Sequence, residues 1–481
     1  MRFVSTRGKT VDITFEEALF TAYTEDGGLL MPETIPNISL ATLQRWKGLS
    51  YVELVKEIIP LFVSTTEISL KEQQELIDAA LSSFDIPDAL RIERLINDLN
   101  VLEMWHGKTL AFKDLAMSCT TQFVNYFLKK RDRHFTAVVV TSGDTGSSAM
   151  QNSIGLDNLD IIVMFAYQKI AKLQELMMTT IQADNMHVYA VDAASSDDAD
   201  ELVEKIFTDH KFVTEHSVGT LNSQNWCRIM VQIVHHVYAY LQTANEVGEP
   251  VDIIIPVGGF GNTTSCLIAK KMGIPLGIVC VSNKNDFLNQ VLKTGVIDQA
   301  PSHLTLAPAM DIAFPINFER ILWLLSGSDG KIVSKIMKEF RTSGSTTLPT
   351  DLMEKVKSTL RSASAGDDVI INTIQRCWKE NEYHICPHTA TAVACFYGLT
   401  EGYKHSGNSA ICLATASAAK FSEAVIKAGL PLKRSPRIDD LNENDARYER
   451  LRKGDDWQEI LRKKICSITA QSKLCVTLPD Y

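Results

Sequence analysis

Short, almost wholly apolar runs recur along the chain from about residue 99, and helical patterns separate them. The runs lie at 136–140, 160–164, 187–191, 252–255, 276–281 and 410–414. Strands that are apolar on both faces belong to covered sheets, and intervening helices make consecutive strands parallel. The sequence therefore predicts an α/β fold with mainly parallel sheets and helices on both faces. Such sheets bind ligands beyond the carboxyl ends of their strands.

Lys113 lies in the stretch EMWHGKTLAFKDLAM, residues 103–117, after a glycine turn and before a helical pattern. The spacing of the apolar residues that follow would bury one face of this helix and fix Lys113 at its entrance. The helix dipole and an apolar setting both disfavour an ammonium ion there, so the amine could form a Schiff base. An ordinary lysine whose charge reaches solvent is the alternative interpretation.

The loop after strand 136–140 is TSGDTG, residues 141–146, and a helix is predicted to begin near Ser147. Small residues let the backbone approach a ligand, hydroxyls add donors, and a helix N-terminus favours an anion. A carboxylate or phosphate would fit this loop. A structural turn would use the same residues, and both interpretations stay open.

The loop after strand 252–255 is PVGGFGNTT, residues 256–264, which opens a further helix. Backbone amides at a helix start cradle phosphate. A dinucleotide fingerprint is the rival interpretation, but Thr264 stands where the third glycine of GxGxxG belongs. Strand 410–414 ends in TASAAKF, where we expect Thr415 to contact a ligand and Ser417 to cap the next helix.

Residues 221–232, LNSQNWCRIMVQ, open another predicted helix. Asn225, Arg228 and Gln232 are three and four residues apart, a spacing that favours one shared face. A guanidinium with amides and Ser223 nearby suits a doubly charged phosphate group. A polar contact between domains is the alternative.

Composition excludes several classes of function. The net charge is -10 and basic runs are short, so no nucleic-acid partner is expected, and no apolar segment approaches membrane-spanning length. The ten cysteines are scattered without CxxC pairs, and His235 and His236 lack a third ligand at metal spacing. We therefore expect an intracellular protein without a metal. The first ten residues lack a secretory core, and a cytoplasmic location is favoured over a mitochondrial one.

The motifs together resemble the threonine synthase family, which has the tryptophan-synthase-β fold, or fold type II, of pyridoxal-phosphate enzymes. Within the family, the sequence is most similar to the second animal threonine synthase-like group, by LNSxNWxRxxVQ, CWxENxY, ASAAKF and the GDxWxxxLR near 454–462. The pieces that match the family follow its order over residues 1 to about 430: YTEDGGLLMPETIP, HGKTLAFKD, TSGDTG, LNSQNWCRIMVQ, PVGGFGN, AMD at 309–311, PHTA at 387–390 and ATASAAKF.

The resemblance implies pyridoxal 5'-phosphate as the cofactor and gives roles to individual residues. Lys113 is the predicted catalytic residue, which would bind the cofactor covalently and then act as the base at the substrate's α-carbon. The predicted cofactor-binding residues are Phe112 and Lys113, Gly258, Gly259, Phe260, Gly261 and Asn262 around the phosphate, and Thr415 at the pyridine nitrogen. The predicted substrate-binding residues are Thr141, Ser142, Gly143, Asp144 and Thr145 near the carboxylate, Ser223, Asn225 and Arg228 near the phosphate, and Lys169, whose flanking AYQKIAK departs from the family pattern.

Two departures bear on the reaction. Val257 and Gly259 stand where microbial threonine synthases carry a hydroxyl and an amide in the cofactor-phosphate loop. Similarity to the animal group implies a phospho-lyase that converts O-phosphothreonine and O-phosphohomoserine into 2-oxobutyrate, ammonia and phosphate. The alternatives are threonine synthase, which makes threonine from O-phosphohomoserine, and a non-catalytic scaffold or signalling protein on the same fold.

The length of 481 residues suffices for several domains. We expect an N-terminal domain at 1–98 and a catalytic half at 99–245, which carries Lys113 and the TSGDTG loop expected to bind the substrate's anionic group. A second catalytic half at 246–430 carries the cofactor-phosphate loop, and a C-terminal helical tail follows at 431–481. The expected partner is a small phosphorylated amino acid, and a homodimer is compatible with the sequence.

Overall fold

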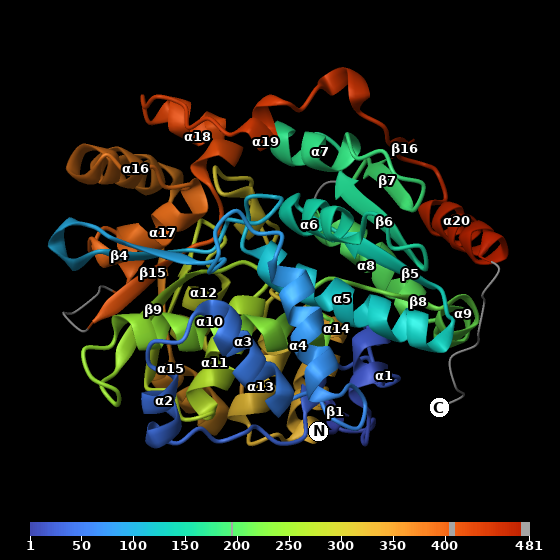
Figure 1. Cartoon of the computed structure of the whole chain (residues 1–481), viewed down its shortest axis with the longest axis horizontal. Helices are drawn as coiled ribbons and strands as arrows, with labels where there is room; N and C mark the ends of the chain where they lie inside the picture. Colours follow the sequence, from blue (N-terminus) through green and yellow to red (C-terminus); the bar gives the residue numbers. More distant parts are fainter. Residues whose placement is uncertain (194–195, 404–408, 473–481) are drawn as a thin grey trace.

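Two sheets dominate the computed structural model, which describes residues 1–193, 196–403 and 409–472 (Figure 1). The larger sheet has seven strands in the order β14-β13-β10-β9-β15-β4-β3, and the smaller has five in the order β16-β7-β6-β5-β8. The strands of the larger sheet are β3 (Arg91–Arg94), β4 (Asn100–Glu103), β9 (Val251–Pro256), β10 (Leu276–Ser282), β13 (Leu360–Ser364), β14 (Glu401–Gly402) and β15 (Ala410–Ala414). Those of the smaller sheet are β5 (Phe135–Val140), β6 (Leu159–Ala166), β7 (Met186–Val191), β8 (Val218–Gly219) and β16 (Glu449–Leu451).

Parallel pairing runs through both sheets. The smaller sheet is parallel throughout, and in the larger sheet only the edge strands β14 and β3 pair antiparallel to their neighbours. Consecutive strands therefore end at the same edge of each sheet, so the loops that follow β5, β9 and β15 can meet. The predicted α/β class, with mainly parallel sheets, is confirmed.

Successive side chains of each central strand enter different cores. In β5, Ala137 and Val139 belong to one core, while Val138 and Val140 belong to another. In β9, Ile253 and Ile254 likewise face different cores. Because neighbouring side chains of a strand point to opposite faces, both faces of each sheet are covered. This arrangement explains why the strands read as continuous apolar runs.

Helices cover both sheets (Figure 1). Helices α6 and α8 both contact β5 and β6, while α17 contacts β9, β10 and β15 of the larger sheet. The helices beyond residue 100 are α5 (Lys113–Arg131), α6 (Asp144–Ser153), α7 (Lys172–Thr179), α8 (Ser196–Phe207), α9 (His210–His216), α10 (Trp226–Thr243), α11 (Gly261–Lys271), α12 (Phe287–Thr294), α13 (Phe318–Leu325), α14 (Gly330–Ser343), α15 (Thr350–Thr359), α16 (Asp367–Asn381) and α17 (Pro387–Phe396). A separate two-stranded antiparallel sheet pairs β11 (Val296–Asp298) with β12 (Ser345–Thr347).

The N-terminal segment packs on the body through α10 and α5. Its helices begin at polar caps, and Ser50 with Glu53 and Ser69 with Glu72 form capping boxes, in which side chain and backbone satisfy each other reciprocally. The elements of this segment are β1 (Phe3–Ser5), β2 (Leu30–Pro32), α1 (Phe15–Phe20), α2 (Leu40–Trp46), α3 (Tyr51–Ile58) and α4 (Leu70–Leu81).

The C-terminal segment runs over the top of the molecule in the view of Figure 1, past α18 (Ser422–Lys427) and α19 (Pro436–Asp439) to α20 (Trp457–Gln471). It contains strand as well as helix, because β16 joins the smaller sheet beside β7. On the way, Arg437 pairs with Asp85 and donates to the carbonyl of Lys108. The segment thus contacts the loop that leads to Lys113.

Several predicted boundaries move in the structure. Helix α6 begins at Asp144, three residues before the predicted start, and strands β3, β4, β8, β13, β14 and β16 are additional to the predicted ones.

The described cysteines are all free. Within the described residues, no helix is both long enough and apolar enough to cross a membrane.

Candidate active site

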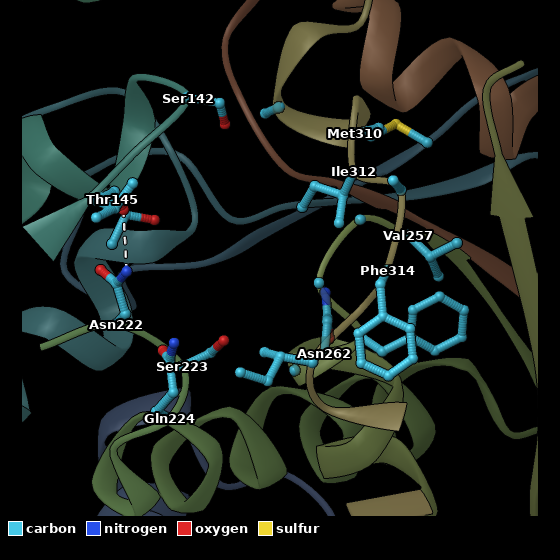
Figure 2. Close-up of a pocket in the computed structure, with 18 of the residues that line it drawn as sticks. Ser142, Thr145, Asn222, Ser223, Gln224, Val257, Asn262, Met310, Ile312 and Phe314 are labelled. Atoms are coloured by element: carbon cyan, nitrogen blue, oxygen red, sulfur yellow. Dashed lines mark hydrogen bonds between the residues drawn. The ribbon is translucent and has the colours of Figure 1, made fainter. Parts of the chain in front are cut away.

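The loops after β5, β9 and β15 line one cavity of about 870 Å³. Figure 2 shows Ser142 and Thr145 on one side of this cavity, Asn222 to Gln224 below them, and Val257, Asn262 and Phe314 on the opposite side. The predicted residues that line the cavity are Phe112, Lys113, Thr141, Ser142, Asp144, Thr145, Ser223, Arg228, Gly258, Gly259, Phe260, Gly261, Asn262 and Thr415. Three predicted residues do not line it: Gly143, Lys169 and Asn225.

Lys113 is the first residue of α5, and its side chain is 18% exposed. The loop before it is tied to the end of β15, because Phe112 N donates to the Thr415 carbonyl at 2.8 Å and Ser417 N donates to the Leu110 carbonyl at 3.0 Å. Asp114 braces the same loop by accepting from the backbone and side chain of Thr109. The amine therefore faces the cavity from a fixed backbone, unlike a solvated surface lysine.

Burial, first of all, lowers the pKa of the Lys113 amine below its ordinary value. The Asp144 carboxylate, whose Oδ2 lies 4.0 Å from Lys113 Nζ, acts in the opposite direction, while the cations Arg228 and Lys420 lower the pKa further. A lysine with a depressed pKa holds more of its free amine near neutral pH. This is the state that a nucleophile or a general base requires.

The TSGDTG loop uses Thr141 for its own turn. Thr141 Oγ1 accepts from Gly143 N at 2.8 Å and Gly146 N at 3.1 Å. Gly143 has φ of 126°, and a Cβ there would lie 2.6 Å from the Gln174 side chain, so glycine is required by conformation and space. Its predicted contact with substrate is therefore corrected to a role in the turn. Ser142 and Thr145 remain as hydroxyl donors toward the cavity.

Asp144 is held by cationic and amide donors. Its Oδ1 accepts from Lys420 Nζ at 2.7 Å and from Gln174 Nε2 at 2.8 Å, and its Oδ2 faces Lys113. Although burial raises the pKa of this carboxyl, the two ammonium groups bring it below its ordinary value. An ionised Asp144 would repel a substrate carboxylate. Its carboxylate instead forms ion pairs with Lys420 and Lys113.

The loop after β9 brings its backbone close to the wall of the cavity. A Cβ on Gly258 would lie 2.8 Å from the carbonyl oxygen of Ala309, and Phe260 adopts a left-handed conformation with φ of 61°. Helix α11 then begins at Gly261. The loop after β9 and the N-terminus of α11 therefore both line the cavity. Backbone amides beside a helix N-terminus are an arrangement that binds phosphate.

Asn262 supplies the test of whether a phosphate-bearing cofactor fits. Its Oδ1 accepts from His235 at 2.8 Å, whereas its buried Nδ2 has no hydrogen-bond partner among the described residues. Burial lowers the pKa of His235 to about 4, so the neutral ring donates through Nε2 and fixes the amide. An orphaned buried donor beside a glycine loop fits the phosphate of pyridoxal phosphate. Lys113 and Thr415 line the same cavity.

The start of α10 separates Asn225 from Arg228, which are both predicted to contact the substrate phosphate. Arg228 lines the cavity, but Asn225 is the N-cap of the helix, where its Oδ1 accepts from Cys227 N at 3.0 Å. Its Nδ2 donates to the carbonyls of Leu19 and Thr220 at 2.6 and 3.1 Å. The prediction that Asn225 contacts substrate is wrong, because the cap and these two bonds use all of its amide.

Lys169 is also wrongly placed by the prediction. It is exposed in the turn that follows β6, and it does not line the cavity. The flanking AYQKIAK, which departs from the family pattern, is the sequence feature that indicates a different place for Lys169.

Within the described residues, no group of three potential metal ligands comes together.

Two residues of the site had no predicted role. His388 lines the cavity, and its Nε2 accepts from Ala309 N at 3.1 Å. Burial lowers the pKa of His388 to about 3, so its ring is neutral. Lys420 is completely buried against Asp144. Both occur in motifs that carried the resemblance, PHTA and ATASAAKF, but neither motif shows which residue its side chain meets.

Three family models match the chain. The threonine synthase N terminus matches residues 2–81, the pyridoxal-phosphate dependent enzyme model matches residues 90–416, and the C-terminal model of threonine synthase matches residues 389–462. The chain is 44% identical to threonine synthase-like 2 of Xenopus laevis, over 98% of this chain and 99% of that protein. It is 43% identical to the human threonine synthase-like 2, over 98% of each.

Solved structures give the same assignment. A threonine synthase from Brucella melitensis with pyridoxal phosphate bound superimposes with a TM-score of 0.88 at 30% identity, covering 98% of this chain and 99% of that one. The yeast threonine synthase superimposes with a TM-score of 0.84 at 29% identity, covering 98% of each. The fold-type II architecture with an N-terminal domain is thereby confirmed.

Proposed function

Because the chain belongs to the threonine synthase family of pyridoxal-phosphate-dependent enzymes, we propose that it is a phospho-lyase acting on phosphorylated amino acids. Its substrates would be O-phosphothreonine and O-phosphohomoserine, and its products 2-oxobutyrate, ammonia and phosphate. The cofactor of the family is pyridoxal 5'-phosphate, which withdraws electrons from a substrate's α-carbon when it is bound. The substrate assignment depends on the chain's own residues.

The observation that supports a phosphorylated substrate is the state of Arg228. Its side chain is 3% exposed, and among the described residues it forms no ion pair. Nη1 donates to the Leu221 carbonyl at 2.7 Å, while Nε has no partner in the described part of the chain. Burial lowers the pKa of this guanidinium to about 10, so it stays charged at neutral pH. A buried, unpaired cation beside a cavity favours an anionic ligand.

Lys113 and Arg228 would divide the elimination between them. The free amine of Lys113 accepts the α-proton of O-phosphothreonine, and the electron pair left behind expels the β-phosphate as the carbon–oxygen bond breaks. Arg228 and Ser223 stabilise the negative charge of the leaving phosphate. The unsaturated amine that is released reacts with one water to give 2-oxobutyrate and ammonia. O-phosphohomoserine would require a second proton removal, at the β-carbon, before its γ-phosphate leaves.

The apolar wall opposite Ser142 and Thr145 supports elimination over addition of water. Val257, Ile312 and Phe314 present apolar side chains to this side of the cavity (Figure 2). A threonine synthase must hold a water molecule at the β-carbon, which calls for polar partners. An elimination needs no such water. Threonine synthase remains the second candidate, because the solved structures that superimpose over nearly the whole chain carry that name.

Product analysis tests the proposal. The cofactor-loaded protein is incubated with O-phosphothreonine and, separately, with O-phosphohomoserine, and phosphate, ammonia, 2-oxobutyrate and threonine are quantified. We expect equal amounts of the first three, with little threonine and no turnover by Lys113→Ala. Mainly threonine from O-phosphohomoserine would identify a synthase. If neither substrate turns over while the cofactor is bound, the chain is a scaffold.

We also propose that the chain divides into the four parts given above, lies in the cytoplasm, binds no nucleic acid and forms a homodimer. The free cysteines of the described residues support a reducing compartment. Size-exclusion chromatography with light scattering tests the homodimer, and fluorescence microscopy of a tagged chain tests the location.

A further inference from the structure

Lys420 is a second lysine beside the site that the proposed reaction does not use. It ends the short 3₁₀ helix after β15, and its side chain is 0% exposed. Its Nζ donates to Asp144 Oδ1 at 2.7 Å. Lys420 does not line the cavity, so a substrate would not touch it. Burying an ammonium ion is costly, and its position against one carboxylate needs an explanation.

The geometry of Asp144 suggests what this ion pair does. Lys420 and Gln174 both donate to Oδ1, which leaves Oδ2 facing Lys113 Nζ at 4.0 Å. One oxygen is therefore fixed by two donors, and the other is directed at the reactive amine. Without Lys420, the carboxylate would keep one amide donor and would be free to approach Lys113 more closely.

Charges around Lys113 are balanced as the structure stands. Two carboxylates, Asp144 and Asp114, and two cations, Arg228 and Lys420, act on its amine, and the nearby His388 is neutral. Because these charges oppose each other, burial is the largest influence on the pKa of Lys113, and burial favours the free amine. Removing one cation would leave an excess of negative charge, which favours the ammonium form.

We propose that Lys420 is a positioning residue that anchors Asp144 and offsets its charge, so that a larger share of Lys113 is present as the free amine near neutral pH. The proposal rests on the role of Lys113 in the proposed function. It nevertheless concerns a property of the chain that exists without substrate or cofactor. Lys113 could otherwise be held as an ammonium ion by Asp144, and it would then be unable to bind an aldehyde or accept a proton.

The test measures how fast Lys113 is acylated in the cofactor-free protein. A trace amount of acetic anhydride is added at a series of pH values, and peptide mass spectrometry gives the rate at each lysine. In Lys420→Met and Lys420→Gln we expect the midpoint of the Lys113 profile to move up by about one pH unit, which is about a tenfold slower reaction near neutral pH. Lys420→Arg should keep the wild-type midpoint.

The three variants separate charge from simple structural support. Glutamine keeps a donor for Asp144 but has no charge, so a wild-type profile in Lys420→Gln would overturn the proposal. An unchanged midpoint in Lys420→Met would also overturn it. If Lys420→Met does not fold, as judged by thermal unfolding, Lys420→Gln and Lys420→Arg still decide. Lys335, which has a side chain 78% exposed, serves as the internal control and should be unaffected.

This outcome is independent of the substrate. A shifted Lys113 profile together with no turnover of either phosphorylated amino acid would support the role of Lys420 and refute the lyase. Turnover of O-phosphothreonine with an unshifted profile would do the reverse. Asp144→Asn adds a check of sign, because removal of the carboxylate should move the Lys113 midpoint down.

Discussion

Replacing Arg228 with methionine should abolish most of the activity on phosphorylated substrates while leaving the fold intact. The cavity offers the phosphate one buried guanidinium, whose Nε is without a partner among the described residues. Loss of charge-assisted hydrogen bonds to the leaving phosphate should cost about 3 kcal/mol in the transition state. That corresponds to a fall of about a hundredfold in kcat/KM for O-phosphothreonine.

The same substitution should have little effect on stability. Removing an unpaired buried cation is favourable, whereas the Leu221 carbonyl loses its donor at 2.7 Å, which costs about 1–3 kcal/mol. These effects oppose each other, so we expect the free energy of unfolding of the cofactor-free protein to change by less than about 2 kcal/mol. Chemical denaturation of both proteins measures this change.

The assay follows phosphate release with O-phosphothreonine and, in parallel, the binding of pyridoxal phosphate by its absorbance. Arg228→Lys is the matched control that keeps the charge, and it should retain more activity than Arg228→Met. A kcat/KM within threefold of wild type for Arg228→Met would refute the assignment of Arg228 to the substrate phosphate. Lost cofactor binding with normal folding would instead place the guanidinium at the cofactor's phosphate.

Three further predictions follow from the hydrogen bonds and charges of other residues. His235→Ala should weaken the binding of pyridoxal phosphate about tenfold in a spectroscopic titration, because Asn262 Oδ1 loses the donor that orients its amide; unchanged affinity would contradict this. Asn225→Ala should lower the free energy of unfolding by about 2–4 kcal/mol, since the substitution removes a helix cap and two further hydrogen bonds. The KM for O-phosphothreonine should stay within about threefold of wild type. A large rise in KM without destabilisation would instead identify Asn225 as a substrate contact. Asp160 lies between two histidines at 2.7 Å each, and although burial raises its pKa, their hydrogen bonds lower it to about 2. A carboxyl with a lowered pKa stabilises the fold above its ordinary pKa, so the difference in unfolding free energy between wild type and Asp160→Asn should shrink as the pH falls from about 5 toward about 2; a difference that does not change over this range would show that the charge of Asp160 is not involved.

The elements that depend on local pattern were predictable from the sequence. Strands such as β9 and β15 were recognised because buried parallel strands are apolar on both faces, and the glycine loop after β9 because a close backbone approach requires small residues. The sequence also predicted Lys113 at the entrance of α5, but the local pattern left an ordinary surface lysine as the alternative, and its role was implied by the family resemblance. The edge strands β3, β14 and β16 were not recognised, because they are short and lack a continuous apolar run.

The partners of each side chain were decided by the tertiary structure. Asn225 and Arg228 are neighbours in a motif, yet one caps α10 and the other faces the cavity, because a shift of three residues at the helix start separates a cap from a lining position. Asp144 and Lys420 are 276 residues apart and form one ion pair. The sequence by itself determined the buried central strands, the loops that follow them and the place of Lys113 at a helix start, since these follow from residues close together in the chain. The charges that surround this amine come from α5, α6, α10 and the 3₁₀ helix after β15, and only the packing of these elements brings them together.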